Sequence, residues 1–117
     1  MVHGIRDGTL ADLCLWLLRW RWRLRIVGVS MQPLLQPGDE VLVDVRAYRR
    51  SPPTPGDIVV LQHPHQPQLH IVKRAISVTP SGDCFVQGDN PSASTDSRSF
   101  GCVNASQLLG KVVCRFL

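Results

Sequence analysis

The sequence has no hydrophobic run long enough to cross a membrane. Its most apolar stretch, Leu10 to Leu18, contains Asp12 and ends at a series of arginines, whereas a spanning helix needs about 20 apolar residues. The stretch also lacks the early positive charge and small-residue cleavage site of a secretory signal. We therefore expect no membrane anchor and a cytoplasmic protein, which the apolar and basic segment from Leu10 to Arg25 could hold weakly at a membrane surface.

Strong charge of one sign is also absent. Thirteen Lys and Arg residues face nine Asp and Glu residues, which gives a formal net charge of +4. Nucleic-acid-binding domains usually carry a larger or more clustered basic excess. We therefore expect no nucleic-acid partner.

The four cysteines, which are Cys14, Cys84, Cys102 and Cys114, include no C-x-x-C pair. This spacing argues against a zinc site of that type. A chain without a secretory signal more commonly keeps its thiols reduced and packed. We expect free cysteines and no cofactor or metal.

The size and composition predict one small β-rich domain. A chain of 117 residues with 44% hydrophobic residues is sufficient for one domain with a modest core. Nine prolines and nine glycines separate valine-rich runs, which is typical of a mostly β protein. We expect a single compact antiparallel β domain over residues 1–117. A short N-terminal helix over about residues 10–18 should follow a cap at Thr9.

Alternation of Trp20, Trp22, Leu24 and Ile26 with arginines predicts a strand with one buried face. The arginine face is either an ordinary solvated surface or a contact surface for anionic groups such as lipid headgroups. Gly-Asp turns at residues 38–39, 56–57 and 82–83 precede three further apolar strands. We expect strands over residues 40–45, 58–62, 69–78, 84–87 and 110–116, arranged as two small curved sheets. The proline-rich segments 49–55 and 63–68 should be loops.

Two segments carry side chains of chemical interest. Ser30 leaves a predicted strand between Gly28 and Pro33, a place where a hydroxyl can be exposed on a rigid element, although most turn serines only bond the local backbone. Lys73 shares the apolar face of a predicted strand with Ile71 and Ala75. Desolvation would lower the pKa of this lysine and let it accept a proton from a serine. An ordinary lysine whose amine reaches solvent is the alternative.

Five motifs in order resemble the type I signal peptidases. The chain has G-x-S-M-x-P at residues 28–33, Gly-Asp before an apolar strand at 38–39 and G-D-I-V-V at 56–60. Lys73-Arg74 lies inside the strand predicted over residues 69–78, and G-D-N…S-x-D-S-R spans residues 88–98, followed by Phe100-Gly101. The resemblance covers Ile26 to Val113.

The resemblance implies a serine endopeptidase with a Ser-Lys dyad, a known variant of the catalytic triad. Ser30 would be the nucleophile, and Lys73 the general base and later the acid. The Ser30 N–H would stabilise the oxyanion, and Ser94 would orient the lysine amine. The remaining implied positions form two groups: Gly28, Met31 and Pro33 in the substrate turn, and Arg74, Asp89, Asn90, Asp96 and Arg98 as structural residues near the site.

Three departures from the family pattern narrow the resemblance. Gly28 stands where some members have a second oxyanion-stabilising hydroxyl, and Pro91-Ser92-Ala93 replaces R-D-N. We also expect no anchoring span and no large inserted domain, which other members of the family have. With His63-Pro64 after the third motif and G-D-N-P-x-A-S-x-D-S-R at residues 88–98, the chain looks most like the nickel-type superoxide dismutase maturation proteases. This resemblance implies a precursor protein with an N-terminal leader as the partner, namely nickel-type superoxide dismutase. A general leader peptidase working at a membrane surface is the alternative.

Other classes remain open at this stage. A non-enzymatic β-rich module could bind an acidic partner through its arginine face. His63, His65 and His70 could bind nickel or copper in a metal carrier. A self-cleaving repressor relative would also use a Ser-Lys pair, but no DNA-binding helix pair precedes Ser30.

Overall fold

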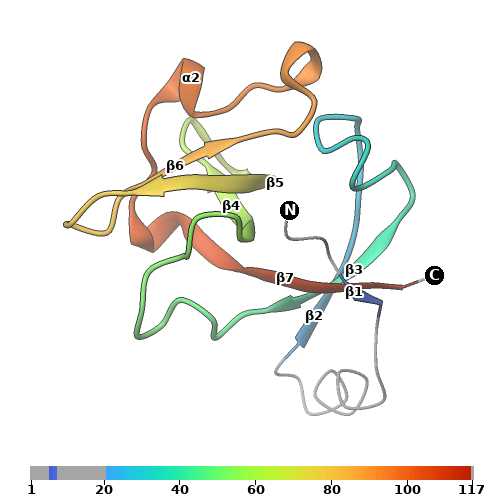
Figure 1. Cartoon of the computed structure of the whole chain (residues 1–117), viewed down its shortest axis with the longest axis horizontal. Helices are drawn as coiled ribbons and strands as arrows, with labels where there is room; N and C mark the ends of the chain where they lie inside the picture. The colour runs from blue at the N-terminus through green and yellow to red at the C-terminus, as the bar shows by residue number, and fades with distance from the viewer. Residues whose placement is uncertain (1–5, 8–20, 117) are drawn as a thin grey trace.

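The structure is a computed structural model that describes residues 6–7 and 21–116 (Figure 1). The helix predicted over about residues 10–18 lies outside the described residues. So does most of the segment from Leu10 to Arg25, for which the sequence left open a weak contact with a membrane surface.

The described chain is mostly antiparallel β-sheet, which confirms the predicted fold class. Neighbouring strands follow the order β2-β3-β7-β4-β5-β6 and pair antiparallel, and β1 pairs with β7 in parallel. The strands are β1 (Arg6–Asp7), β2 (Arg21–Arg25), β3 (Glu40–Asp44), β4 (Ile58–His63), β5 (Gln66–Val78), β6 (Cys84–Gln87) and β7 (Leu108–Phe116).

The strands form one continuous sheet, so the prediction of two small sheets is wrong. The cause is β7, which begins at Leu108, two residues before its predicted start. Its first part pairs with β4 and its second part with β3, so one long strand joins both halves of the domain (Figure 1). Register shifts in several pairings, such as the one between Leu42 and Val43, let this sheet coil.

The coiled sheet encloses two groups of buried apolar side chains. One group includes Ile26, Leu35 and Val41, next to the loop between β2 and β3. The other includes Val59 and Val86, under the β4-β5-β6 half. Val59 and Val60 are consecutive residues of β4 but belong to different groups. This follows from strand geometry, which points neighbouring side chains to opposite faces.

The predicted loop over residues 63–68 is wrong in part. His63 is the last residue of β4 and β5 already begins at Gln66, so only Pro64 and His65 connect the two strands. The ladder accommodates Pro67 because the register shifts between Gln62 and His63, and irregular pairing is where a strand tolerates a residue without an N–H. The resulting β4-β5 hairpin has longer arms than the sequence indicated.

Acidic residues of the neighbouring strand neutralise part of the arginine face of β2. Arg23 donates through Nε and Nη2 to the Glu40 carboxylate over 2.8 and 2.9 Å. The Arg23 guanidinium also lies 4.9 Å from the centre of the Phe116 ring. Arg21 Nη1 lies 3.5 Å from Asp44 Oδ2. Two of the arginines are therefore engaged within the sheet, which leaves less free charge for an anionic partner.

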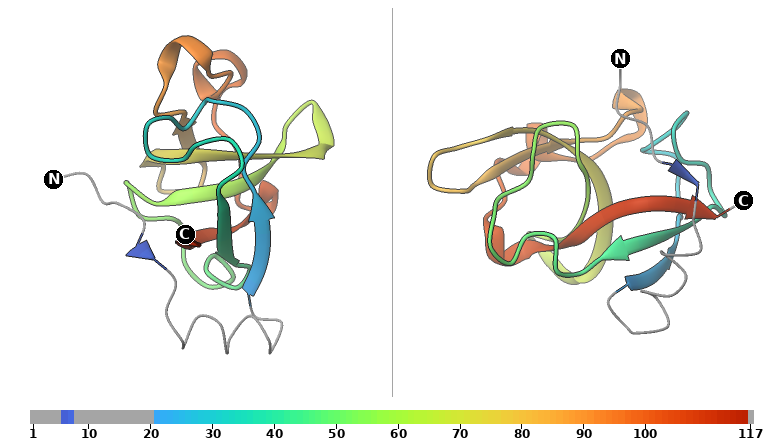
Figure 2. Two further views of the ribbon diagram at one scale, coloured as in Figure 1. Left: turned by 90° about the vertical axis from the view of Figure 1, so that its right-hand side faces the viewer. Right: turned by 60° about the horizontal axis from the view of Figure 1, so that its bottom comes forward.

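Two loops converge at one end of the sheet, as both views of Figure 2 show. One connects β2 to β3 and contains Ser30. The other connects β6 to β7 and contains the 3₁₀ turn η1 (Pro91–Ala93), the short helix α2 (Ser97–Phe100) and the 3₁₀ turn η2 (Ala105–Gln107). Asp96 caps α2 by accepting from the Arg98 N–H over 3.1 Å. An aspartate before a short helical turn is a recognisable signal in a sequence, although the motifs above do not predict this helix.

Candidate active site

A cavity of about 400 Å³ lies between the end of β2 and the middle of β5. Residues 24–28, 30 and 31 line one side, and residues 69–73 line the other. Because consecutive residues of both segments border the cavity, backbone groups contribute to its walls as well as side chains. Its accessible lining is more apolar than polar, so it suits a ligand with apolar groups.

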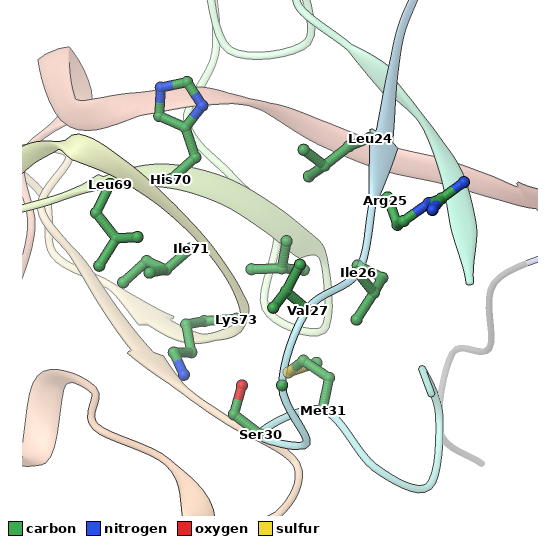
Figure 3. A pocket seen from close by; sticks show the side chains of 12 residues that line it. Leu24, Arg25, Ile26, Val27, Ser30, Met31, Leu69, His70, Ile71 and Lys73 are labelled. Atoms are coloured by element: carbon green, nitrogen blue, oxygen red, sulfur yellow. The ribbon is translucent and has the colours of Figure 1, made fainter. Parts of the chain in front are cut away.

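Ser30 and Lys73 meet in this cavity. The Ser30 hydroxyl and the Lys73 amine point toward one another from opposite walls (Figure 3). Ser30 belongs to the loop after β2, whereas Lys73 lies in the middle of β5 and pairs across the sheet with Val59 of β4. The fold thus brings together two side chains that are 43 positions apart in the sequence.

Lys73 is buried, with 4% of its surface exposed, and its amine donates to Ser94 Oγ over 3.0 Å. Burial lowers the pKa of Lys73 below the ordinary lysine value. The charge of Asp96 opposes this change in pKa and that of Arg98 reinforces it. A lysine with a lowered pKa is a better proton acceptor near neutral pH than an exposed one.

Ser94 has a fixed hydrogen-bond polarity. Its hydroxyl donates to Asp96 Oδ2 over 2.8 Å, and an ionised carboxylate can only accept. The proton of Ser94 therefore points at Asp96, and its oxygen lone pairs remain for an N–H of Lys73. This contact directs one amine hydrogen toward Ser94. The nitrogen lone pair of a neutral Lys73 is then free for another partner.

Asp96 is 1% exposed yet ionised. Burial alone would raise the pKa of this carboxyl, but the Arg98 guanidinium, the Gly88 N–H and the Ser94 hydroxyl together hold the pKa well below its usual range. Arg98 donates to both carboxylate oxygens, over 2.9 Å from Nε and 2.8 Å from Nη2. Asp96 thus forms its ion pair with Arg98, two residues further along the same loop.

The loop carrying Ser30 is tied to the loop between β6 and β7. Asn90 N–H donates to the Ser30 carbonyl over 2.8 Å, and Asn90 Nδ2 donates to the Val29 carbonyl over 3.1 Å. Gly88 lies where a Cβ atom would collide with the Ser94 side chain and stand 2.7 Å from the Ser30 carbonyl oxygen. The sequence placed Asn90 near the site without indicating that it holds the candidate nucleophile.

Arg74 and Asp89 form a second ion pair beside the site. Arg74 donates through Nε and Nη2 to Asp89, over 2.9 Å each, and through Nη1 to the Gly56 carbonyl over 3.1 Å. This pairing raises the pKa of Arg74 above its already high ordinary value. Because Arg74 follows Lys73 on β5, the two side chains leave opposite faces of the strand. The pair fixes the residue that precedes Asn90.

The three predicted residues of the substrate turn have different environments. Gly28 has a φ of +83°, a left-handed conformation that favours glycine. Met31 is 2% exposed and packs in the core, although it also borders the cavity. Pro33 instead lines a separate cavity of about 410 Å³ together with Leu34, Arg74 and Asp89.

The three histidines of the metal-carrier hypothesis occupy two places. The rings of His63 and His65 are 6.0 Å apart, whereas His70 packs edge-on against Trp22 with ring centres 5.3 Å apart. Within residues 6–7 and 21–116, no three His, Cys, Asp or Glu side chains gather into a group that could hold a metal ion. The same part of the chain contains no helix with the length and apolar character needed to span a bilayer.

An antiparallel β fold with a serine and a buried lysine in one cavity is the arrangement that the resemblance to signal peptidases predicts. The family described as signal peptidase, peptidase S26, matches residues 11–80 and 77–117. The chain belongs to this family.

The curated relatives of this chain are named as proteases of the mitochondrial inner membrane. Subunit 1b of the mitochondrial ATP-independent inner membrane protease of Arabidopsis thaliana is 34% identical over 110 residues, which cover 75% of this chain and 65% of that protein. Subunit 2 of the mitochondrial inner membrane protease of Mus musculus is 35% identical over 105 residues, covering 72% of this chain and 60% of that protein. The chain thus spans less than two thirds of the length of these relatives.

Proposed function

We propose that this protein is a serine endopeptidase that removes an N-terminal leader from a precursor protein, with Ser30 as nucleophile and Lys73 as general base. The observation that carries the proposal is the meeting of the Ser30 hydroxyl and the buried Lys73 amine in one cavity (Figure 3). Membership of the signal peptidase family supports the reaction class.

The reaction needs no group from outside the chain except water. Neutral Lys73 accepts the proton of Ser30 Oγ while this oxygen attacks the scissile carbonyl. The Ser30 N–H stabilises the resulting oxyanion. As the intermediate collapses, the Lys73 ammonium returns the proton to the leaving amine and an acyl-Ser30 ester remains. Lys73 then takes a proton from water, whose oxygen attacks the ester, and returns it to Ser30 Oγ as the new carboxyl terminus leaves.

Binding of the substrate as an extended strand follows from the pairing of β5. Residues 70–74 pair with β4 on one side, and β6 pairs only from residue 74 onward. Among the described residues, residues 69–73 therefore have no strand partner on the side away from β4. An extended peptide can occupy such an edge through its backbone, and the wall offers alternate side chains such as Leu69 and Ile71. We propose that the leader binds here with small or aliphatic residues before the scissile bond.

The substrate proposed here is the precursor of a nickel-type superoxide dismutase, in the cytoplasm. This proposal rests on the sequence resemblance described above. The alternative is a general leader peptidase at a membrane surface, which the inner-membrane names of the relatives favour. Both substrates require the same dyad, so the reaction and the substrate are tested separately.

The reaction is tested with fluorogenic peptides that contain aliphatic leader sequences, read by mass spectrometry of the products. The protein should cleave between two defined residues, and Ser30→Ala and Lys73→Arg should both abolish cleavage. Arginine keeps the positive charge but does not deprotonate at working pH. A serine-directed acylating inhibitor should label the protein but not Ser30→Ala. Cleavage that survives in either variant, or labelling that survives in Ser30→Ala, would contradict the dyad.

The substrate is tested by offering two precursors, a nickel superoxide dismutase precursor in solution and a leader-bearing precursor on anionic vesicles. The N-terminus of each product is read by mass spectrometry. Release of the dismutase leader alone supports the maturation protease. Cleavage of the vesicle-bound precursor alone would replace that substrate by the membrane-surface alternative.

A further inference from the structure

The candidate base of this protein is placed close to a buried negative charge. Lys73 Nζ lies 3.0 Å from Ser94 Oγ, and Ser94 Oγ lies 2.8 Å from Asp96 Oδ2. The amine is thus two hydrogen bonds from a carboxylate that is 1% exposed. A negative charge at this range favours the ammonium form of a lysine. The two hydrogen bonds that link Lys73 to Asp96 through Ser94 therefore orient the amine but also place it near a negative charge. This charge opposes the neutral state that a general base requires.

Arg98 supplies the opposing charge. Its Nε and Nη2 atoms donate to Asp96 Oδ1 and Oδ2, and its backbone N–H donates to Oδ1 over 3.1 Å. This two-pronged geometry is the strongest form of an arginine-carboxylate contact. The Asp96 side chain is 1% exposed and that of Arg98 is 40% exposed. The carboxylate thus faces Ser94 from the interior, and the guanidinium covers it from the solvent side.

We infer that Arg98 keeps Lys73 in its neutral, proton-accepting form by neutralising Asp96, which leaves Asp96 able to orient Ser94. This inference rests on the proposed role of Lys73 as general base and makes Arg98 a positioning residue. The directions of the electrostatic effects agree with it. The Asp96 charge raises the pKa of Lys73 and the Arg98 charge lowers it, with burial as the largest lowering effect.

The other described groups around the Lys73 amine do not offset the charge of Asp96. Ser30 faces Lys73 from the loop after β2 and is neutral, and Val59 of β4 is its cross-strand neighbour. From the other loop, Ser94 is neutral and Asp89 pairs with Arg74, on the opposite face of β5. In the part of the chain that the structure describes, Asp96 and Arg98 are the charged groups that shift the pKa of Lys73.

The test measures the pKa of Lys73 directly, without any substrate. The chain contains two lysines, Lys73 and Lys111. Carbon-13 labelling of lysine therefore gives two side-chain signals, and Lys111→Arg assigns them. In Arg98→Gln the pKa of Lys73 should rise by about one to three units, because the Asp96 charge is then uncompensated. In Asp96→Asn it should fall below the wild-type value, because Arg98 then acts alone.

Arg23→Gln is the matched control. Arg23 also donates through Nε and Nη2 to a carboxylate, that of Glu40, so this variant removes the same charge and the same type of contact from the opposite edge of the sheet. It should leave the pKa of Lys73 unchanged. In Arg98→Lys the pKa of Lys73 should stay close to the wild-type value, because lysine restores the positive charge without the bidentate contact. It also tests the inference if Arg98→Gln does not fold.

Activity gives the second measurement. The pH at which kcat/KM of Arg98→Gln reaches half its maximum should move upward by the same amount as the pKa, so activity well below that pH falls about tenfold per unit. Activity should recover at higher pH. A Lys73 pKa that is equal in wild type, Arg98→Gln and Asp96→Asn would overturn the inference. If the pKa values shift as stated but the wild type cleaves no leader peptide, the electrostatic inference stands and the proposed function fails.

Discussion

Asn90 holds the backbone of Ser30, with 2.8 Å between the Asn90 nitrogen and the Ser30 carbonyl oxygen. The two residues are 60 positions apart in the sequence. Asp89, directly before Asn90, is held in turn by Arg74, the residue after Lys73. The segment that positions the candidate nucleophile is therefore fixed to the strand that carries the candidate base. A displacement of either loop changes the distance between the two reacting groups.

The Asn90 side chain should contribute to turnover more than to stability. Asn90→Ala removes the Nδ2 bond to the Val29 carbonyl but keeps the backbone bond to Ser30. One partly exposed hydrogen bond contributes about 1 kcal/mol to stability. We expect a decrease of kcat by about tenfold, since small displacements of a reacting group are costly. Peptide-cleavage assays measure the change in kcat, and urea unfolding measures the change in stability. Unchanged kcat together with a large loss of stability would assign Asn90 a purely structural role.

Gly88→Ala should strongly reduce peptidase activity through a steric effect alone. The added methyl group would collide with the Ser94 side chain and press on the Ser30 carbonyl oxygen at 2.7 Å. The Ser94-Lys73 contact and the Ser30 loop would both have to move. Activity should fall by about a thousandfold, the order of effect expected when the alignment of reacting groups is lost. Kinetics and circular dichroism show whether activity is lost while the fold remains.

Gly82→Ala is the control for a glycine substitution. A Cβ atom at residue 82 meets nothing within 4 Å, but its φ of +94° is strained for alanine. This variant should lose about 1 kcal/mol of stability and keep its activity. If both variants lost activity equally, the effect of Gly88→Ala would come from general destabilisation.

Ser94→Ala should slow the reaction less than loss of Ser30 or Lys73. Ser94 takes no part in bond making, and its oxygen accepts one hydrogen bond from the Lys73 amine. Without it the amine keeps its burial but loses its preferred orientation. We expect kcat to decrease by about ten- to a hundredfold, a typical cost for a misaligned proton acceptor, with KM nearly unchanged. A fall of kcat as large as that of Lys73→Arg would give Ser94 a direct role in proton transfer.

Local signals predicted the strands better than their connections. The Gly82-Asp83 turn located β6 at Cys84–Gln87 without error, because a tight turn fixes where an adjacent strand begins. β7 joins the two predicted sheets into one because it pairs with both β3 and β4. Such long-range pairing leaves no local pattern in the sequence. The loop predicted at residues 63–68 was wrong because a register shift accommodates the proline.

The sequence motifs named the residues of the candidate site but not the contacts between them. Matching motifs indicated Ser30 and Lys73, which line one cavity in the structure, and Ser94, which accepts a hydrogen bond from Lys73. The direction of the Ser94 hydroxyl and the bond from Asn90 to Ser30 were not predictable. Both depend on where Asp96 and the 88–96 loop lie in space, and motif spacing contains no such information.

A buried base lowers the stability of the protein that carries it, and this cost can be measured. In the folded protein the pKa of Lys73 is below its ordinary value, mainly because of burial. Between the folded-state and unfolded-state pKa values, the unfolded chain binds more protons, so the free energy of unfolding of the wild type increases as pH rises through this interval. Below the interval the penalty is complete, about 1.4 kcal/mol for each unit by which the pKa is lowered.

Lys73→Met should therefore be inactive but more stable than the wild type. Methionine fills a similar space without a charge to desolvate. The gain should be largest at and below the folded-state pKa of Lys73, and it should shrink as pH approaches the ordinary lysine value of about 10.4. Urea unfolding of both proteins from pH 6 to pH 10 measures the difference, in which other titrating groups cancel. Lys111→Met is the control, because Lys111 is 42% exposed and lies 3.5 Å from Asp57. A stability gain for Lys73→Met that stays constant across this pH range would show that the gain comes from packing, and that the amine of Lys73 titrates as an ordinary exposed lysine.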